Sequence, residues 1–307
     1  MRNFLDIIFN RKNRSQSNDN CDFLGSSDTT SDTKENLGDL TSEEVFPHLI
    51  ISNFTSTIEN DEKMWVTTSM LTRFLESFTD DLVILRKGEI IGTIGWREIL
   101  IPLVDNPTSS FFFNTTADEH TNRDIFAVFP DTKMKKFLPE MYKRQRESAI
   151  LQTYDNTFSS ISSRSILEIG LQLDPGIKVS DLPQRKITNF AHNETVETII
   201  RLMTRNDSSV LTLENTSSFL SAQIILERIV NDFKYLKQID NFLDLPISDF
   251  KLKNAKMISP NTSIVEICKI MLNMRHPFVM THDQLLTPKD VLGVLANYMI
   301  SKNKHRA

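Results

Sequence analysis

Residues 81–100 read DLVILRKGEIIGTIGWREIL, and the same pattern returns without a gap as SAILQTYDNTFSSISSRSIL at 148–167 and DSSVLTLENTSSFLSAQIIL at 207–226. Each copy opens with an apolar run typical of a strand, turns through polar residues into a second short strand and ends at a helix start. A shorter fourth copy occupies residues 277–292, with its turn at 282–284. The chain therefore contains four copies of one predicted β-hairpin.

An amphipathic helix is predicted upstream of each hairpin, because apolar residues recur there at the spacing of one helix face. A short strand and a polar cap are expected before each helix, the first strand at residues 65–67. Each unit then has the order strand–helix–strand–strand–helix. One such unit is too small to cover its own apolar face, so the units are expected to pair. The helices are expected to include residues 70–78, 134–142, 196–203 and 264–272.

This pattern resembles the CBS domain, named after cystathionine β-synthase, over about residues 46–300. The resemblance is clearest in VSDLPQRKITNFAHNETVETIIRLM at 179–203 and ISDFKLKNAKMISPNTSIVEICKIML at 247–272. It implies an α/β fold of four tandem CBS repeats, paired into two Bateman modules at about 46–172 and 177–300. The repeats are assigned to residues 46–105, 106–175, 176–235 and 236–301.

Residues 1–45 are expected to precede the first repeat as a short helix and a disordered tether. Residues 10–44 are rich in Ser, Asn, Asp and Thr, and such a segment buries too little apolar surface to fold alone. Residues 1–14, MRNFLDIIFNRKNR, combine apolar and basic side chains. They are expected to dock on a partner, to pack on the protein's own modules or to lie weakly on an anionic membrane surface.

The resemblance implies a regulatory protein that binds an adenosine-containing ligand, namely AMP, ADP, ATP or S-adenosylmethionine, and that carries out no catalysis. The family's ligand signature is a Thr or Ser, two further residues and an Asp whose carboxylate holds the ribose hydroxyls. Only the fourth repeat has it in full, at Thr287-Pro288-Lys289-Asp290. The matching pairs in the other repeats are Gly95 and Glu98, Ser162 and Ser165, and Ser221 and Ile224.

Further ligand contacts are implied on the first strand and the hairpin start of the fourth repeat. Arg275 and His276 are candidates for a phosphate contact, and Glu98 is a candidate for a ribose contact. The pattern Thr-x-x-Asp is also a helix capping box, with Pro288 at the first helical position, so a purely structural role stays open. The implied contact positions are Met257, Ile258, His276, Pro277 and Phe278.

Composition argues against several other classes of protein. None of the 8 glycines stands in a Rossmann or P-loop frame, and the net charge of −5 disfavours nucleic acid as a partner. The 2 cysteines make no disulfide framework, and no signal peptide or membrane span is found, so a cytoplasmic location is expected. Cys268 is expected in the core, and His276 and His282 are expected in an exposed loop rather than at a metal. No catalytic constellation, cofactor or metal site is expected.

Two functions stay open. The first is a stand-alone sensor, for example of cellular energy state, that modulates an unidentified partner protein. Because modules of this family commonly dimerise, a homodimer is expected by resemblance. The second is an interaction scaffold that has lost most ligand binding and docks through residues 1–14, as the three incomplete signatures indicate.

Overall fold

A computed structural model describes residues 37–46, 57–74, 80–146, 148–155, 157–162, 164–183, 187–232 and 241–304. All of these ranges belong to one compact unit, Lys34–Ala307. Residues 1–14 and most of the predicted tether lie outside the described residues. In the described ranges, every helix is too short or too polar to cross a lipid bilayer.

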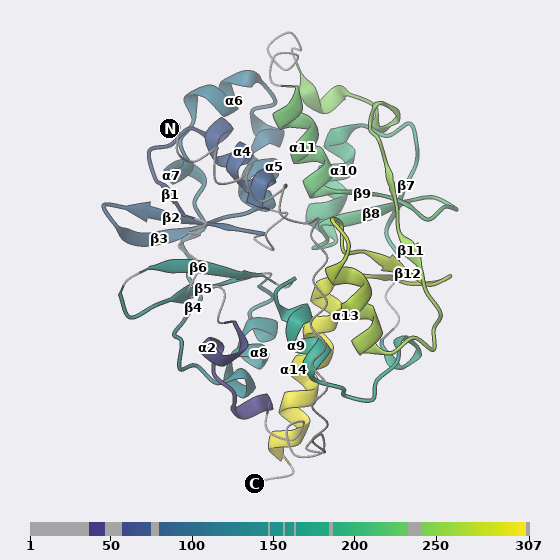
Figure 1. Ribbon diagram of the computed structural model, residues 1–307. Helices are drawn as coiled ribbons and strands as arrows, with labels where there is room; N and C mark the ends of the chain where they lie inside the picture. The colour runs from purple at the N-terminus through teal and green to yellow at the C-terminus, as the bar shows by residue number, and fades with distance from the viewer. Residues whose placement is uncertain are drawn as a thin grey trace, which may run out of the picture. The chain divides into compact units, whose positions relative to one another are not determined.

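Each repeat builds one small sheet, in which the first strand pairs in parallel with the second and the second pairs antiparallel with the third (Figure 1). All four predicted hairpins are confirmed. In the third repeat, β10 (Lys253–Asn254) joins the sheet as a fourth strand beside β9. The strands in repeat order are β1 (Thr57–Glu59), β2 (Leu82–Arg86), β3 (Glu89–Ile94), β4 (Ala127–Val128), β5 (Ser148–Gln152), β6 (Phe158–Ser162), β7 (Asn189–Phe190), β8 (Val210–Leu213), β9 (Ser218–Ser221), β11 (Lys256–Met257), β12 (Val279–Met280) and β13 (Leu285–Leu286).

Two main helices accompany each sheet, and the predicted apolar faces are the buried ones. Helix α10 buries Val196, Ile199, Ile200 and Met203, while the hydroxyl of Thr195 accepts the N–H of Thr198 and caps the first turn. The main helices are α4 (Met64–Phe74), α5 (Trp96–Asp105), α8 (Met134–Lys143), α9 (Ile166–Gln172), α10 (Val196–Arg205), α11 (Ala222–Asn231), α13 (Ile264–Leu272) and α14 (Pro288–Lys304). Helices α6 (Ser109–Asn114) and α7 (Ala117–His120) follow α5.

The strand predicted at residues 65–67 is wrong. Residues 65–67 lie in α4, and the first strand of the repeat is β1, at Thr57–Glu59. Met64, Thr67, Thr68 and Leu71 are buried at the spacing of a helix face, which favours a helix over an alternating strand.

The two repeats of each module meet through their sheets. Val83 of β2 packs with Ile150 and Phe158 of the second repeat in a small core of their own, and Figure 1 shows the two sheets facing each other. In the other module the rings of Phe219 and Phe278 meet edge to face, with centroids 5.1 Å apart. The expected pairing into two Bateman modules is confirmed.

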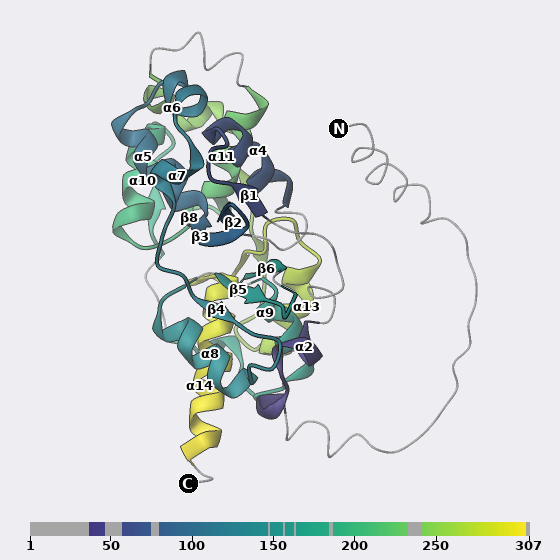
Figure 2. The same ribbon diagram turned by 90° about the vertical axis from the view of Figure 1, so that its left-hand side faces the viewer.

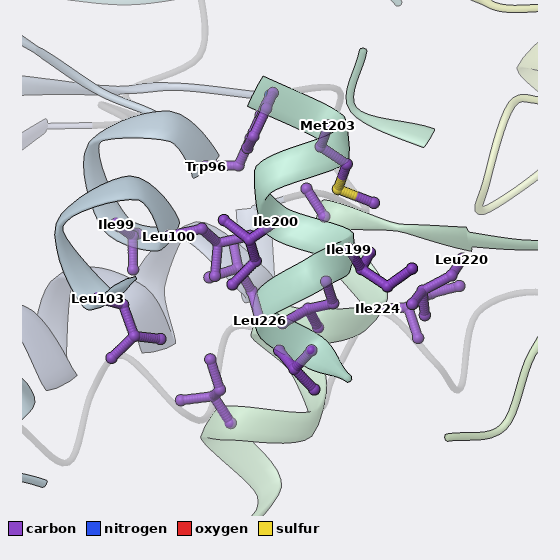
Figure 3. Close-up of a cluster of buried hydrophobic side chains, with 14 of the residues drawn as sticks. Trp96, Ile99, Leu100, Leu103, Ile199, Ile200, Met203, Leu220, Ile224 and Leu226 are labelled. Carbon is purple, nitrogen blue, oxygen red and sulfur yellow. The ribbon is translucent and has the colours of Figure 1, made fainter. Parts of the chain in front are cut away.

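The two modules join through their helices within one chain. Helices α4 and α5 of the first repeat pack on α10 and α11 of the third, and α8 and α9 of the second pack on α13 and α14 of the fourth. Figure 2 shows the same two groups from the side, and Figure 3 shows Leu100, Ile200 and Leu226 meeting in the first group. The helix-to-helix pairing of modules thus forms inside the chain, and a homodimer stays a prediction that needs another surface.

A crossed pattern of capping also ties the repeats of each module together. The first residue of each repeat's first helix donates its N–H to a carbonyl of the partner repeat, which satisfies one of the unpaired groups of that helix end. The donor and acceptor pairs are Met64 and Thr115 at 3.0 Å, Met134 and Leu40 at 2.9 Å, Val196 and Leu245 at 3.1 Å, and Ile264 and Ile177 at 3.1 Å. In the second module the acceptors lie beside the 3₁₀ turns η3 (Val179–Asp181) and η5 (Ile247–Asp249).

The tether was predicted to extend to residue 45, and this end point is wrong. Residues 37–46 form the 3₁₀ turn η1 (Leu37–Asp39) and helix α2 (Ser42–Val45), and they supply the cap of α8. Val45 and Phe46 are buried in the core shared by the second and fourth repeats. The capping box of Thr41 and Glu44 matches that of Thr116 and Glu119, and this match is the sequence signal that could have shown the segment.

Candidate ligand site

A cavity of about 200 Å³ is lined by residues of all four repeats. Its lining includes Trp96, Arg164, Gln223 and Lys289, one residue from each signature stretch. The four stretches are far apart in the sequence, and the packing of the two modules brings them to one place. The cavity is therefore a site of the whole folded unit and not of a single repeat.

The complete signature lies in this lining. Helix α14 begins at Pro288, and the Asp290 carboxylate accepts the backbone N–H of Thr287 at 2.8 Å and the hydroxyl of Thr287 at 2.9 Å. The capping role left open by the sequence is thus present in the structure. Thr287 and Asp290 both border the cavity, so the cap and the candidate site coincide.

The other expected contact residues of the fourth repeat divide into two groups. Pro277 and Phe278 line the cavity. Met257 is 52% exposed on β11, Ile258 packs against the core of the second and fourth repeats, and Arg275 forms an ion pair with Glu227 at 2.9 Å. These last three side chains lie outside the lining of this cavity.

His276 is buried, and the expectation of an exposed loop histidine is wrong for it. The residue is 7% exposed, and its ring lies 6.1 Å from that of Phe219. Neither ring nitrogen has a hydrogen-bond partner among the described residues. Burial, followed by the charges of Arg275, Lys253 and Arg164, lowers the pKa of His276 to about 4, so the ring is neutral at pH 7. His282 is exposed, as expected.

The incomplete signature of the first repeat is occupied by the protein's own side chains. Glu98 lies outside the cavity lining and accepts the N–H of Gly95 at 3.0 Å and the amide of Asn122 at 3.3 Å. A side chain at Gly95 would overlap the carboxylate of Asp81, which also accepts the hydroxyl of Ser148. The space beside this signature is thus filled by Asp81.

The signatures of the second and third repeats act as local caps. Ser162 and Ser165 are both buried, and their hydroxyl oxygens lie 3.3 Å apart. In the third repeat the Ser221 hydroxyl accepts the N–H of Ile224 at 3.3 Å, and Ser221 also lines the cavity.

Sequence reasoning missed the charged residues around the cavity. Arg164 is 5% exposed and donates from Nη2 to the carbonyl of Met274 at 3.3 Å. Burial lowers the pKa of its guanidinium, and the negative charge of Asp80 opposes that shift. Asp207 accepts from Arg97 at 2.6 Å and from Lys289 at 2.9 Å. Burial raises the pKa of Asp207, but Lys289 and Arg97 outweigh burial and hold it below its usual value.

A signal for the basic residues does exist in the alignment of the four signatures. The third position of each signature is occupied by Arg97, Arg164, Gln223 and Lys289, three of which are basic. That column indicates a common location for positive charge, although the sequence does not show that the four positions converge.

The sequence matches no protein-family model and no curated protein. Among solved structures, protein MJ1225 from Methanocaldococcus jannaschii, proposed as an archaeal homolog of g-AMPK, superposes with a TM-score of 0.67 at 13% identity, over 78% of this chain and 95% of that chain. A CBS domain-containing protein from Bacillus anthracis has a TM-score of 0.36 at 14% identity, over 44% of this chain and 96% of that one. The CBS domain of the bacterial CNNM/CorC family Mg²⁺ transporter, solved in complex with ATP, has a TM-score of 0.35 at 14% identity, over 44% and 89%.

The repeated strand order, the sheet-to-sheet pairing of repeats and the helix-to-helix joining of two modules agree with the likeness to MJ1225 over most of both chains. At this identity the likeness concerns the fold. The chain is a protein of the CBS-domain fold, with four tandem repeats paired into two Bateman modules.

Proposed function

We propose that this chain is a regulatory protein whose cavity binds an adenosine-containing small molecule, and that binding changes the activity of a partner protein. The observation that carries the proposal is that Thr287 and Asp290, the complete signature, border a cavity built from all four repeats. A ligand there contacts both modules. It shifts their arrangement only as far as its affinity differs between two arrangements.

The chemistry of the lining suits a nucleoside. Ile187, Val210 and Phe278 offer apolar surface for a purine ring. A carboxylate has about four acceptor positions, so capping by Asp290 is compatible with its accepting ribose hydroxyls. The first residues of α11 and α14 also border the cavity, and helix N-termini favour negatively charged or electron-rich groups.

Thermal unfolding of the full chain with AMP, ADP, ATP and S-adenosylmethionine tests the proposal. A ligand at 100 times its dissociation constant should stabilise the chain by about 2.7 kcal/mol. Asp290→Asn should abolish that stabilisation. Glu98→Gln is the matched control, because Glu98 caps α5 from the same helix position but lies outside the cavity lining. Stabilisation by none of the four ligands would refute an adenosine sensor, and stabilisation that survives in Asp290→Asn would place the site elsewhere.

An interaction scaffold is the second candidate. It is favoured by the incomplete ligand signatures of the first and second repeats. In the first repeat Asp81 fills the space beside the signature, and in the second the hydroxyls of Ser162 and Ser165 pair with each other. Docking through residues 1–14 belongs to this candidate and lies outside the described residues. Docking of residues 1–14 on a membrane is tested by co-sedimentation with anionic liposomes, in which the full chain is compared with a version that starts at Leu37. Equal sedimentation of the two proteins would refute membrane docking.

The proposed function has two more specific versions, in which the protein senses cellular energy state and in which it works as a homodimer. Energy sensing requires AMP, ADP and ATP to compete for one cavity, which displacement of one nucleotide by another would show. A homodimer requires a molecular mass of about twice 35.3 kDa in sedimentation equilibrium. The helix faces between the modules are already buried within the chain, so the dimer would use a different surface.

A further inference from the structure

Asp207 holds two cations that come from two other repeats. It follows the end of α10 in the third repeat, and its carboxylate accepts from Arg97 of the first repeat and from Lys289 of the fourth, at 2.6 Å and 2.9 Å. The side chain of Lys289 is 13% exposed, whereas that of Asp207 is 58% exposed. Ion pairs with an exposed partner add little stability. Their importance here is that a negative charge lies at the border of the cavity beside its positive charges.

The ionisable side chains of the lining are close to balanced. Asp80, Asp207 and Asp290 border the cavity, and so do Arg164 and Lys289. Lys289 is paired with Asp207, and the negative charge of Asp80 favours the charged form of Arg164. With Arg97, which also pairs with Asp207, three carboxylates stand against three cations, so the positive charges that would attract a phosphate chain already face carboxylates.

We propose that Asp207 determines the charge of the ligand that this cavity accepts: an adenosine compound without a phosphate chain, either the nucleoside or an S-adenosyl sulfonium, in preference to ATP. The inference rests on the proposed function and narrows its ligand class. A triphosphate would have to displace Asp207 from Lys289 or lie beside three carboxylates, and like charges a few ångströms apart repel each other. A neutral nucleoside or a sulfonium cation meets neither obstacle.

Asp207→Asn removes the charge while keeping the backbone. Position 207 has a φ of 49°, in the left-handed region that Asn tolerates well. Asp118→Asn is the matched control, because Asp118 also holds two cations, Arg86 at 2.7 Å and Arg123 at 2.8 Å, but lies outside the cavity lining.

Isothermal titration of the full chain with adenosine, S-adenosylmethionine, ATP and tripolyphosphate measures the selectivity. We expect the unaltered chain to bind adenosine or S-adenosylmethionine at least about tenfold more tightly than ATP. In Asp207→Asn, the dissociation constant for ATP should fall by about tenfold or more relative to that for adenosine or S-adenosylmethionine. A change of this size corresponds to one close charge contact. Asp118→Asn should leave the ratio unchanged.

The outcomes separate this inference from the function on which it rests. Tighter binding of ATP than of adenosine and S-adenosylmethionine by the unaltered chain, or a ratio unchanged in Asp207→Asn, would overturn the role of Asp207. If no adenosine compound binds but tripolyphosphate binds only to Asp207→Asn, the charge role of Asp207 stands and the adenosine function fails. If none of the four compounds binds to either protein, both fail.

Discussion

Gly170 of α9 lies directly against Cys268 of α13, so that a side chain at position 170 would overlap the cysteine sulfur. The two residues belong to the second and fourth repeats, whose helices form one of the two joints between the modules. Cys268 is fully buried. The missing side chain of Gly170 therefore sets how closely α9 and α13 approach.

Gly170→Ala should destabilise the fold through this contact. In a free helix the change would stabilise by about 0.5–1 kcal/mol, but overpacking against a buried sulfur costs about 1–3 kcal/mol. In a Cys268→Ala background the new Cβ would lie 3.4 Å from the Cβ of residue 268, an ordinary contact, so the penalty should disappear. Urea unfolding of the four proteins gives the coupling energy. Additive effects of the two substitutions would contradict the contact.

Burial should also make the Cys268 thiol unreactive. Burial raises its pKa to about 12, so almost no thiolate exists at pH 7. In a Cys21→Ser variant, a thiol reagent should label the chain only after denaturant is added, at a rate that follows unfolding. Rapid labelling of the native protein would show that α9 and α13 separate readily.

Phe46→Ala should destabilise the protein by about 3–5 kcal/mol, although the composition of the preceding residues predicts a tether. The ring is fully buried, and its removal leaves a cavity in the core of the second and fourth repeats. Phe129→Ala is the control, because that ring is 49% exposed and its loss should cost much less. Thermal unfolding compares the two variants. Equal stabilities would mean that residues 37–46 do not belong to the folded unit.

His276 should make the protein less stable in mild acid. Its native pKa of about 4 lies below the unfolded value of about 6.5, so the unfolded chain binds more protons between these limits and stability rises with pH. Lowering the pH from 6.5 to 4 should therefore remove roughly 3 kcal/mol that is fully present above pH 6.5. A His276→Leu variant should lack this component, and His282→Leu, altered at an exposed position, should keep it. Denaturant titrations at several pH values measure the difference, and parallel pH profiles of the native chain and His276→Leu would refute the buried neutral ring.

Local patterns account for the parts of the fold that the sequence predicted correctly. The strand at Val210–Leu213 and the buried face of α10 follow from the order of apolar residues within a few positions, which is what periodicity encodes. The first strand was misplaced because Thr57–Glu59 is short and mostly polar. The order of residues 37–45 was missed because it depends on capping a helix of the next repeat.

The sequence by itself determined the four repeats, the family they resemble and the complete signature at Thr287 and Asp290. Only the tertiary structure decided that the first repeat packs on the third and the second on the fourth, that His276 is buried, and that Asp207 faces Arg97 and Lys289. The physical reason is the range of the interactions. Strands, helices and caps depend on neighbours a few residues away, whereas burial and the pairing of charges at the cavity depend on segments far apart in the chain that meet only when the modules pack.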